Sequence, residues 1–106
     1  MQNGVPERGD IVWVNFSPQA GKRPAIILTQ FVYNKIGLMV CCPITSQAKR
    51  YPFEVPVTGC NITGVILVDA VKNLDWRARP IDFICAAPQN VLDEVSRKLK
   101  LLLPCA

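Results

Sequence analysis

The stretch IVWVNF, Ile11–Phe16, decides the fold class of this chain. It is rich in β-branched and aromatic residues and follows the turn-forming tripeptide Arg8–Asp10, so it predicts a β-strand. Ser17 and Pro18 end this strand, and the apolar run Ala25–Thr29 follows after a short connection. Two strands so close in the sequence are expected to pair antiparallel.

The following residues continue the pattern of short strands. We expect a central strand at Leu38–Cys42, where the apolar character is continuous, and a polar loop at Pro43–Gln47. Phe53–Val57 alternates like an edge strand, in which the missing N–H of Pro56 costs no ladder hydrogen bond. The remaining expected elements are a short helical turn or excursion at Phe31–Lys35, a strand at Val65–Val68 after a turn at Thr63 and Gly64, and weaker strands at Asn73–Trp76 and Ile81–Ala86.

The last part of the chain has a helical period. Its apolar residues recur at helical spacing, at Val91, Leu92, Val95, Leu99 and Leu102. Pro88 stands where a helix can begin, and acidic residues precede basic ones, as the helix dipole favours. Several short strands followed by one amphipathic helix predict a mainly β fold, a small SH3-like antiparallel barrel with an added C-terminal helix.

Composition limits the classes of protein to consider. The 106 residues are enough for one domain, here 1–106, and half of them are hydrophobic, which argues against disorder. No apolar run approaches the roughly 18 residues that span a bilayer. The N-terminal residues lack the basic and apolar parts of a signal peptide, so we expect a cytoplasmic protein with no membrane association.

Cysteine and histidine usage restricts the chemistry. The chain has five cysteines and no histidine, no Cys-x-x-Cys pair and no tight acidic cluster, so we expect neither a metal nor a cofactor. Cys41, Cys42 and Cys85 lie in apolar segments and are expected to pack in the core as small hydrophobes. Cys60 and Cys105 are expected nearer the surface, with no neighbour that marks either as a nucleophile.

Without histidine, a positioned arginine is the first candidate for catalysis. Arg23 stands just before an apolar strand, and its planar guanidinium matches two phosphate oxygens. Thr45 could donate a hydroxyl hydrogen bond to a non-bridging phosphate oxygen. The plainer interpretation is that Arg23 forms a surface ion pair and Thr45 caps a turn.

Basic residues also gather in expected loops and at strand ends. The chain carries a net charge of +4, and its basic clusters are Lys22-Arg23, Lys49-Arg50 and Arg77-x-Arg79. Clusters on connections can converge on one face and neutralise phosphates. The alternative is scattered, solvated charge.

Several motifs together resemble the MazF/PemK family of toxin ribonucleases. They run in the family's order over nearly the whole chain, as RGDIVWV-x-F-x-P from Arg8, G-x-RPA from Gly21, CPITSQ from Cys42, YPFEV from Tyr51, GVILVD from Gly64 and VKNLDWRAR from Val71. Single pieces such as Arg-Pro-Ala occur often by chance, so the ordered set carries the resemblance.

The resemblance implies a homodimeric endoribonuclease. Such an enzyme cleaves single-stranded mRNA at short motifs without a metal and leaves a 2′,3′-cyclic phosphate and a 5′-hydroxyl. A smaller MazE-like antitoxin would bind the dimer and occlude its RNA groove. The family's arginine falls on Arg23 and its threonine on Thr45, with Ser46 and Gln47 as helpers. Stabilisation of charge is the role that the guanidinium chemistry supports best.

RNA contacts are expected from the basic clusters and from aromatic residues. Arg77 and Arg79 would point the same way in an extended segment and, with Lys22, Lys49 and Arg50, could follow the RNA backbone. Trp13, Phe16 and Trp76 are candidates for base stacking. Trp13 and Phe16 have opposite parity on one strand, and we expect Phe16, at the strand end, to face the groove.

The chain departs from the family between Pro18 and Arg23. Family members carry a longer loop there, whereas only Gln19–Lys22 remain here. Either the loop is truly short, which would weaken its grip on substrate and its regulation by antitoxin, or residues are missing between the numbered positions; the intact flanking motifs favour the second explanation. Two other functions stay open: a non-catalytic CcdB-like toxin that poisons DNA gyrase, and an inactive RNA-binding barrel.

Overall fold

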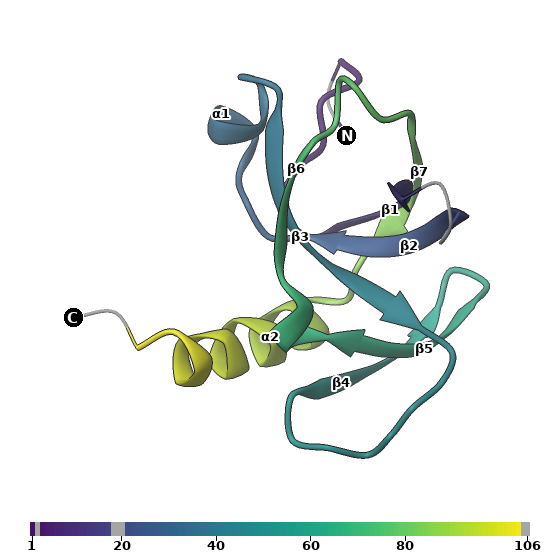
Figure 1. Cartoon of the computed structure of the whole chain (residues 1–106), viewed down its shortest axis with the longest axis vertical. Coiled ribbons are helices and arrows are strands. Elements are labelled where there is room, and N and C mark those ends of the chain that lie inside the picture. The colour runs from purple at the N-terminus through teal and green to yellow at the C-terminus, as the bar shows by residue number, and fades with distance from the viewer. Residues whose placement is uncertain (2, 18–20, 105–106) are drawn as a thin grey trace.

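The structure is a computed structural model that describes residues 1, 3–17 and 21–104. Within these ranges a curved antiparallel sheet carries most of the chain, and one longer helix packs against it (Figure 1). In chain order the elements are β1 (Asp10–Ser17), β2 (Gly21–Ile27), α1 (Phe31–Asn34), β3 (Leu38–Thr45), β4 (Glu54–Gly59), β5 (Ile62–Leu67), the 3₁₀ turn η1 (Val68–Ala70), β6 (Lys72–Asp75), β7 (Ile81–Ala86) and α2 (Gln89–Leu102).

Strand β3 is the centre of the sheet. The strand order is β4-β5-β3-β2-β1-β7, and β6 also pairs with β3. The first half of β3 pairs with β6, and its last residues, Ile44 and Thr45, pair with Ile66 and Val65 of β5. Because two strands share one edge of β3, the sheet opens there into two halves. Thr45 lies in the half that also holds the β4–β5 hairpin.

The core has two parts because alternate residues of β1 and β2 point to opposite faces. Ile11 and Ile26 join the part beneath α2 and the β4–β5 hairpin. Val12 and Val14 join the part between β1, β2, β3 and β6. The predicted pairing of the first two strands and the predicted central position of the third are confirmed.

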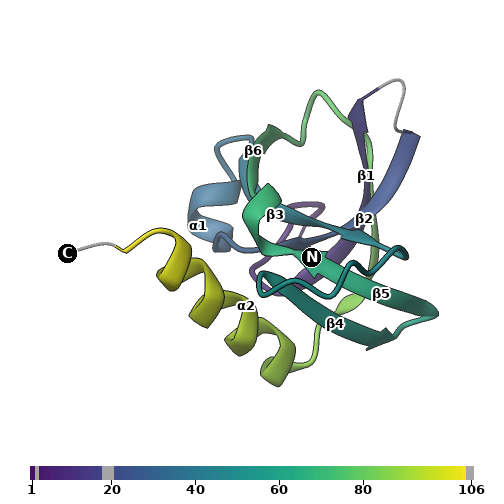
Figure 2. The same cartoon turned by 60° about the horizontal axis from the view of Figure 1, so that its bottom comes forward.

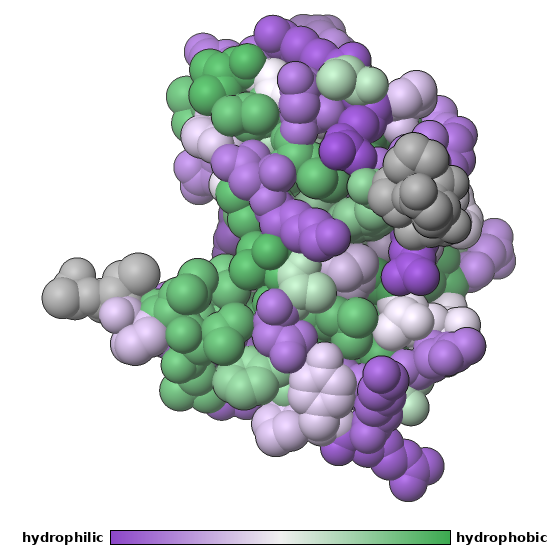
Figure 3. All heavy atoms as spheres, in the orientation of Figure 1, coloured by the Kyte–Doolittle hydropathy of each residue, from purple (hydrophilic) through white to green (hydrophobic). Residues whose placement is uncertain are grey.

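Helix α2 covers one side of the sheet (Figure 2). It buries Val91, Leu92 and Val95, three of the residues that the helical period singled out. At its far end Leu101 and Leu103 are more than half exposed, and Figure 3 shows apolar side chains gathered at this end of the molecule. In the described ranges, neither helix has the length and apolar character needed to cross a bilayer. The predicted mainly β fold with a C-terminal amphipathic helix is confirmed.

Two local predictions are wrong. Strand β3 continues through Pro43 to Thr45, where a polar loop was expected, because Pro43 and Ile44 are buried and pair with neighbouring strands. The expected turn at Thr63 and Gly64 lies inside β5 instead. The chain reverses three residues earlier, at Cys60 and Asn61, where Gly59 pairs with Ile62.

The connection between β1 and β2 is short. Ser17 pairs with Gly21, so only three residues of the continuous sequence join the two strands. The preference for missing residues is therefore wrong, and the chain lacks the longer family loop. The connection itself, residues 18–20, lies outside the described residues.

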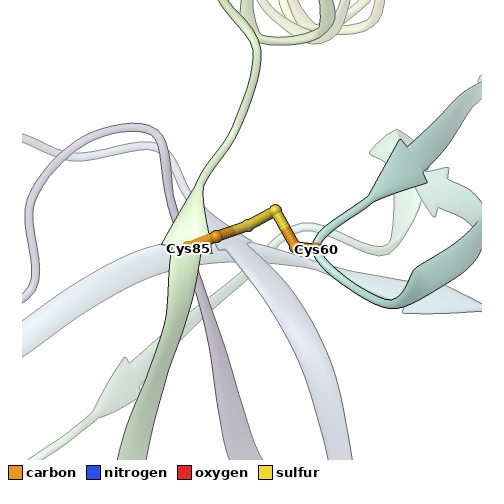
Figure 4. Close-up of a disulfide and its surroundings, with 2 residues drawn as sticks. All are labelled: Cys60 and Cys85. Atoms are coloured by element: carbon orange, nitrogen blue, oxygen red, sulfur yellow. A yellow bond between two sulfur atoms is a disulfide. The ribbon is translucent and has the colours of Figure 1, made fainter.

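Cys60 and Cys85 form a disulfide, with their Cα atoms 6.1 Å apart (Figure 4). The bond joins the β4–β5 turn to β7, which corrects the prediction that Cys85 is a free thiol in the core. Cys41 and Cys42 are free and buried, so their predicted packing is confirmed. Cys105 lies outside the described residues.

Candidate functional site

A cleft of about 480 Å³ opens where β2, β3 and the β4–β5 hairpin meet. Four polar residues that were expected at the site line this cleft. They are Arg23 from β2, Thr45 at the end of β3, and Ser46 and Gln47 just beyond it. Trp13, Pro24 and Ile44 supply apolar surface, and Asn61, Ile62 and Thr63 form the wall contributed by the β4–β5 hairpin. Arg23 and Thr45, 22 positions apart in the sequence, thus line one cavity, because β2 and β3 are neighbours in the sheet.

The hydroxyl of Thr45 is held by the backbone that follows it. The N–H of Gln47 donates a hydrogen bond to Thr45 Oγ1 over 3.2 Å. Since the oxygen accepts this bond, the hydroxyl proton is left to be donated outward. Thr45 is half-buried, so its side chain is both fixed and accessible from the cleft.

Gly64 lets the two strands approach closely behind Thr45. A Cβ at this position would overlap the Thr45 carbonyl oxygen and touch its carbonyl carbon at 3.1 Å. Glycine is therefore required here by space rather than by backbone conformation. This close contact sets the position of Thr45 at the end of β3.

Arg23 is exposed and accepts a new partner easily. Among the described residues, neither a hydrogen bond nor an ion pair uses its guanidinium, so its donors remain available for an anion. The surface ion pair of the plainer interpretation belongs instead to Lys22, whose Nζ lies 3.2 Å from Asp82 Oδ2.

Trp13, rather than Phe16, is the aromatic residue of the cleft. Trp13 is 39% exposed and lines the cavity, whereas Phe16 packs against the second part of the core with Lys72 Nζ 5.6 Å from its ring centre. Phe16 was expected in the groove because it stands at the strand end, and the structure does not support this choice. The side that carries Trp13 faces the β4–β5 hairpin, which the sequence could not place.

A second cavity of about 190 Å³ shares Thr45 and Gln47 with the first and extends to Lys49. The loop there is organised by Glu54, which is 6% exposed. Its carboxylate accepts hydrogen bonds from two backbone N–H groups. The N–H of Lys49 donates to Oε2 and the N–H of Arg50 donates to Oε1, each over 2.9 Å. Sequence reasoning gave Glu54 no role, because it looked for paired carboxylates rather than for a loop anchor.

Tyr51 and Asp69 close the outer side of this loop. The Tyr51 hydroxyl donates to Asp69 Oδ1 over 3.1 Å. Partial desolvation, followed by this hydrogen bond, raises the pKa of Tyr51 above its ordinary value. The raised pKa keeps the phenol protonated to higher pH than usual, which suits its role as hydrogen-bond donor to Asp69.

The aromatic and basic residues after β6 lie away from the cleft. Trp76 is half-buried and donates its indole N–H to the Asn34 carbonyl over 2.7 Å. Arg77 stacks on Trp76 and donates to the Lys35 carbonyl, and Arg79 donates to the carbonyls of Asn15 and Phe16.

The prediction that Arg77 and Arg79 point the same way is wrong. Both lie in a turn rather than in an extended segment, because the Asp75 carboxylate accepts hydrogen bonds from the N–H groups of Arg77 and Ala78. Their contact with RNA stays a prediction, and the structure gives both side chains partners within the fold.

The buried thiols and the carboxylates offer no alternative centre. Burial raises the pKa of both Cys41 and Cys42 to about 12, so neither is a thiolate near neutral pH. In the part of the chain that the structure describes, no group of three acidic or cysteine side chains is placed to hold a metal ion.

Comparison with known proteins gives one family. Residues 7–103 match the family described as PemK-like, MazF-like toxin of type II toxin-antitoxin system. The chain is 51% identical over 105 residues to the endoribonuclease toxin MazF of Escherichia coli strain K12, covering 93% of this chain and 95% of that protein.

Solved structures agree with the sequence comparison. The crystal structure of MazF (Form-I) from Deinococcus radiodurans superposes with a TM-score of 0.91 at 45% identity, covering 97% of this chain and 100% of that one. A MazE-MazF crystal structure (Form-II) from the same organism gives a TM-score of 0.90 at 44% identity, with 98% and 100% covered.

Proposed function

Because the chain belongs to the family of PemK-like, MazF-like toxins of type II toxin-antitoxin systems, we propose that it is an endoribonuclease that cleaves single-stranded mRNA. The family resemblance seen in the sequence motifs is thereby confirmed. The observation that carries the proposal is the convergence of Arg23 and Thr45 on one open cleft. Cleavage proceeds without a metal and leaves a 2′,3′-cyclic phosphate and a 5′-hydroxyl.

The chemistry divides between the two residues. When the 2′-oxygen attacks phosphorus, its proton passes to water in the open cleft, negative charge grows on the two non-bridging oxygens, and the 5′-oxygen takes a proton from water as it leaves. Arg23 binds the two non-bridging oxygens with its free donors, and the Thr45 hydroxyl donates a hydrogen bond to one of them. Both donors stand ready in the cleft before the charge develops, which makes their stabilisation of the transition state effective.

The surroundings of the cleft bind the rest of the substrate. Lys49 lines the adjoining cavity and, with Arg50 on the loop held by Glu54, neutralises neighbouring phosphates. Ser46 and Gln47 hold the nucleotide next to the scissile bond. The exposed leucines at the end of α2 provide apolar surface for association of two copies. A MazE-like antitoxin occludes the groove in the cytoplasm.

An assay of RNA cleavage tests the proposal. Purified protein is incubated with a long single-stranded transcript in excess EDTA, beside Arg23→Ala and Thr45→Ala, with Arg97→Ala and Thr58→Ala as matched surface controls. We expect chelator-resistant cleavage by the wild type and both controls, and a loss of about 10³-fold in Arg23→Ala. Product 5′ ends should accept phosphate from a kinase without prior phosphatase treatment.

Other outcomes would change the assignment. Full activity in Arg23→Ala would show that Arg23 does not stabilise the reacting phosphate, and cleavage abolished by EDTA would indicate a metal-dependent reaction. A wild type that leaves RNA whole but inhibits DNA gyrase would instead establish the CcdB-like alternative.

A further inference from the structure

The cleft wall that comes from the β4–β5 hairpin includes a two-residue turn that the proposed mechanism does not use. Gly59 pairs with Ile62, and Cys60 and Asn61 between them have φ of 55° and 60°. Both values lie in the left-handed region, which suits asparagine but is unusual for cysteine. Cys60 is therefore kept at this position for a reason other than backbone preference.

The disulfide supplies that reason. Cys60 is bonded to Cys85, and Cys85 pairs with Ile11 in the strand that also carries Trp13 (Figure 4). The bond thus ties the turn to β7, which pairs with β1, the strand that carries Trp13. With its neighbour fixed covalently and its own φ set by the turn, Asn61 has a defined position on the wall.

The two sides of the cleft present complementary chemistry. Asn61 is exposed, and none of the described residues forms a hydrogen bond with its side-chain amide. An amide can donate and accept at once, which matches the edge of a base. Trp13 offers a flat, 39% exposed surface on which an unpaired base can stack.

We propose that Asn61 is a specificity-determining residue that hydrogen-bonds the edge of a base stacked on Trp13, with the Cys60–Cys85 disulfide holding it in place. The proposal rests on the proposed ribonuclease function. The base it reads adjoins the phosphate bound by Arg23 and Thr45, because all four side chains line the same cavity.

The test is the cleavage motif of Asn61→Ala. A single-stranded RNA library with randomised sequence is digested, and the new 5′ ends are sequenced. We expect discrimination at one position of the motif to fall about tenfold while the other positions keep theirs. Asn90→Ala, an exposed asparagine on α2 outside the cleft, is the matched control and should reproduce the wild-type motif.

Gln47→Ala separates Asn61 from the other amide of the cleft. If Gln47→Ala relaxes that position and Asn61→Ala leaves the motif unchanged, the proposal is overturned while the ribonuclease function stands. If the wild type leaves the library intact, both fall together.

The role of the disulfide is tested by reduction. A dithiol gives two electrons and two protons to the Cys60–Cys85 bond, producing two thiols and a cyclic disulfide of the reagent. We expect reduction to relax the same motif position as Asn61→Ala does. The Cys60→Ser, Cys85→Ser protein should show the relaxed motif with or without dithiol. Identical motifs in oxidised and reduced wild type would overturn this role.

Discussion

Arg23 and Arg79 are the same residue type in two regions of one small protein, and their surroundings differ. Arg79 donates two hydrogen bonds of 2.8 Å to the carbonyls of Asn15 and Phe16, so its guanidinium closes the end of β1. Arg23 stands on the open cleft with its donors uncommitted among the described residues. An arginine can bind phosphate only with donors that the fold has not already used. Under the proposed function, Arg23 therefore has a binding role and Arg79 a structural one.

The sharpest test of this comparison is Arg23→Lys. The substitution keeps the charge but loses the planar fork, so we expect kcat to fall about 10²-fold and stability to stay unchanged. Initial rates on single-stranded RNA and urea unfolding curves measure the two quantities. Wild-type kcat in Arg23→Lys would show that a point charge suffices and that the fork geometry of the cleft has no role.

Gly64→Ala should displace Thr45, because Gly64 packs directly against the Thr45 backbone. The new Cβ would overlap the Thr45 carbonyl, so we expect a loss of about 3 kcal/mol in the free energy of unfolding, at the upper end for overpacking. The folded fraction should also lose about tenfold in kcat, because the Thr45 hydroxyl moves. Gly59→Ala meets no neighbouring atom and serves as a control for space, although its positive φ adds backbone strain. If Gly64→Ala costs no more stability than Gly59→Ala, the close approach is not what positions Thr45.

Arg79→Ala tests the structural side. Removing a charged donor of two backbone hydrogen bonds should cost about 2 kcal/mol of stability. At temperatures where the variant stays folded, its kcat should remain near that of the wild type, since the side chain lies away from the cleft. Urea unfolding and RNA cleavage at low temperature give both values. A large loss of kcat with unchanged stability would show that Arg79 acts on RNA, as Arg23 is proposed to do, and has no structural role.

The same contrast explains what the sequence could predict. Strands β1 and β2 and helix α2 follow from local period and composition, and the meeting of Arg23 with Thr45 follows from motifs kept in the family's order. Arg77 and Arg79 look equally basic in the sequence, yet their partners are backbone carbonyls contributed by distant segments. No local pattern reports which carbonyls lack a donor.

The wall of the cleft was hidden for a different reason. Residue types favour a turn at Thr63 and Gly64, whereas the chain turns at Cys60 and Asn61 with a cysteine in the left-handed region. The pairing of Cys60 with Cys85 spans 25 residues and could not be selected from an odd number of cysteines. Without that wall, strand parity alone could not decide between Trp13 and Phe16.

Lys22→Ala gives the smallest expected effect and tests the boundary between the two regions. Lys22 neighbours Arg23 but forms an ion pair with Asp82, with side chains 49% and 66% exposed. Exposed pairs contribute little, so the free energy of unfolding should change by less than about 0.5 kcal/mol. If Lys22 exchanges Asp82 for a phosphate when RNA binds, the slope of log affinity against log salt should fall by about 0.7.

Asp82→Asn is the matched control for this exchange. It removes the partner and leaves Lys22 in place, so we expect the wild-type salt slope with slightly tighter binding, because the lysine no longer has to leave a carboxylate. Fluorescence anisotropy with a labelled RNA in the inactive Arg23→Ala background measures affinity without cleavage. An unchanged slope in Lys22→Ala would show that Lys22, like Arg79, keeps its partner within the fold and does not bind a phosphate. Arg23 would then be the cation of β2 that binds RNA.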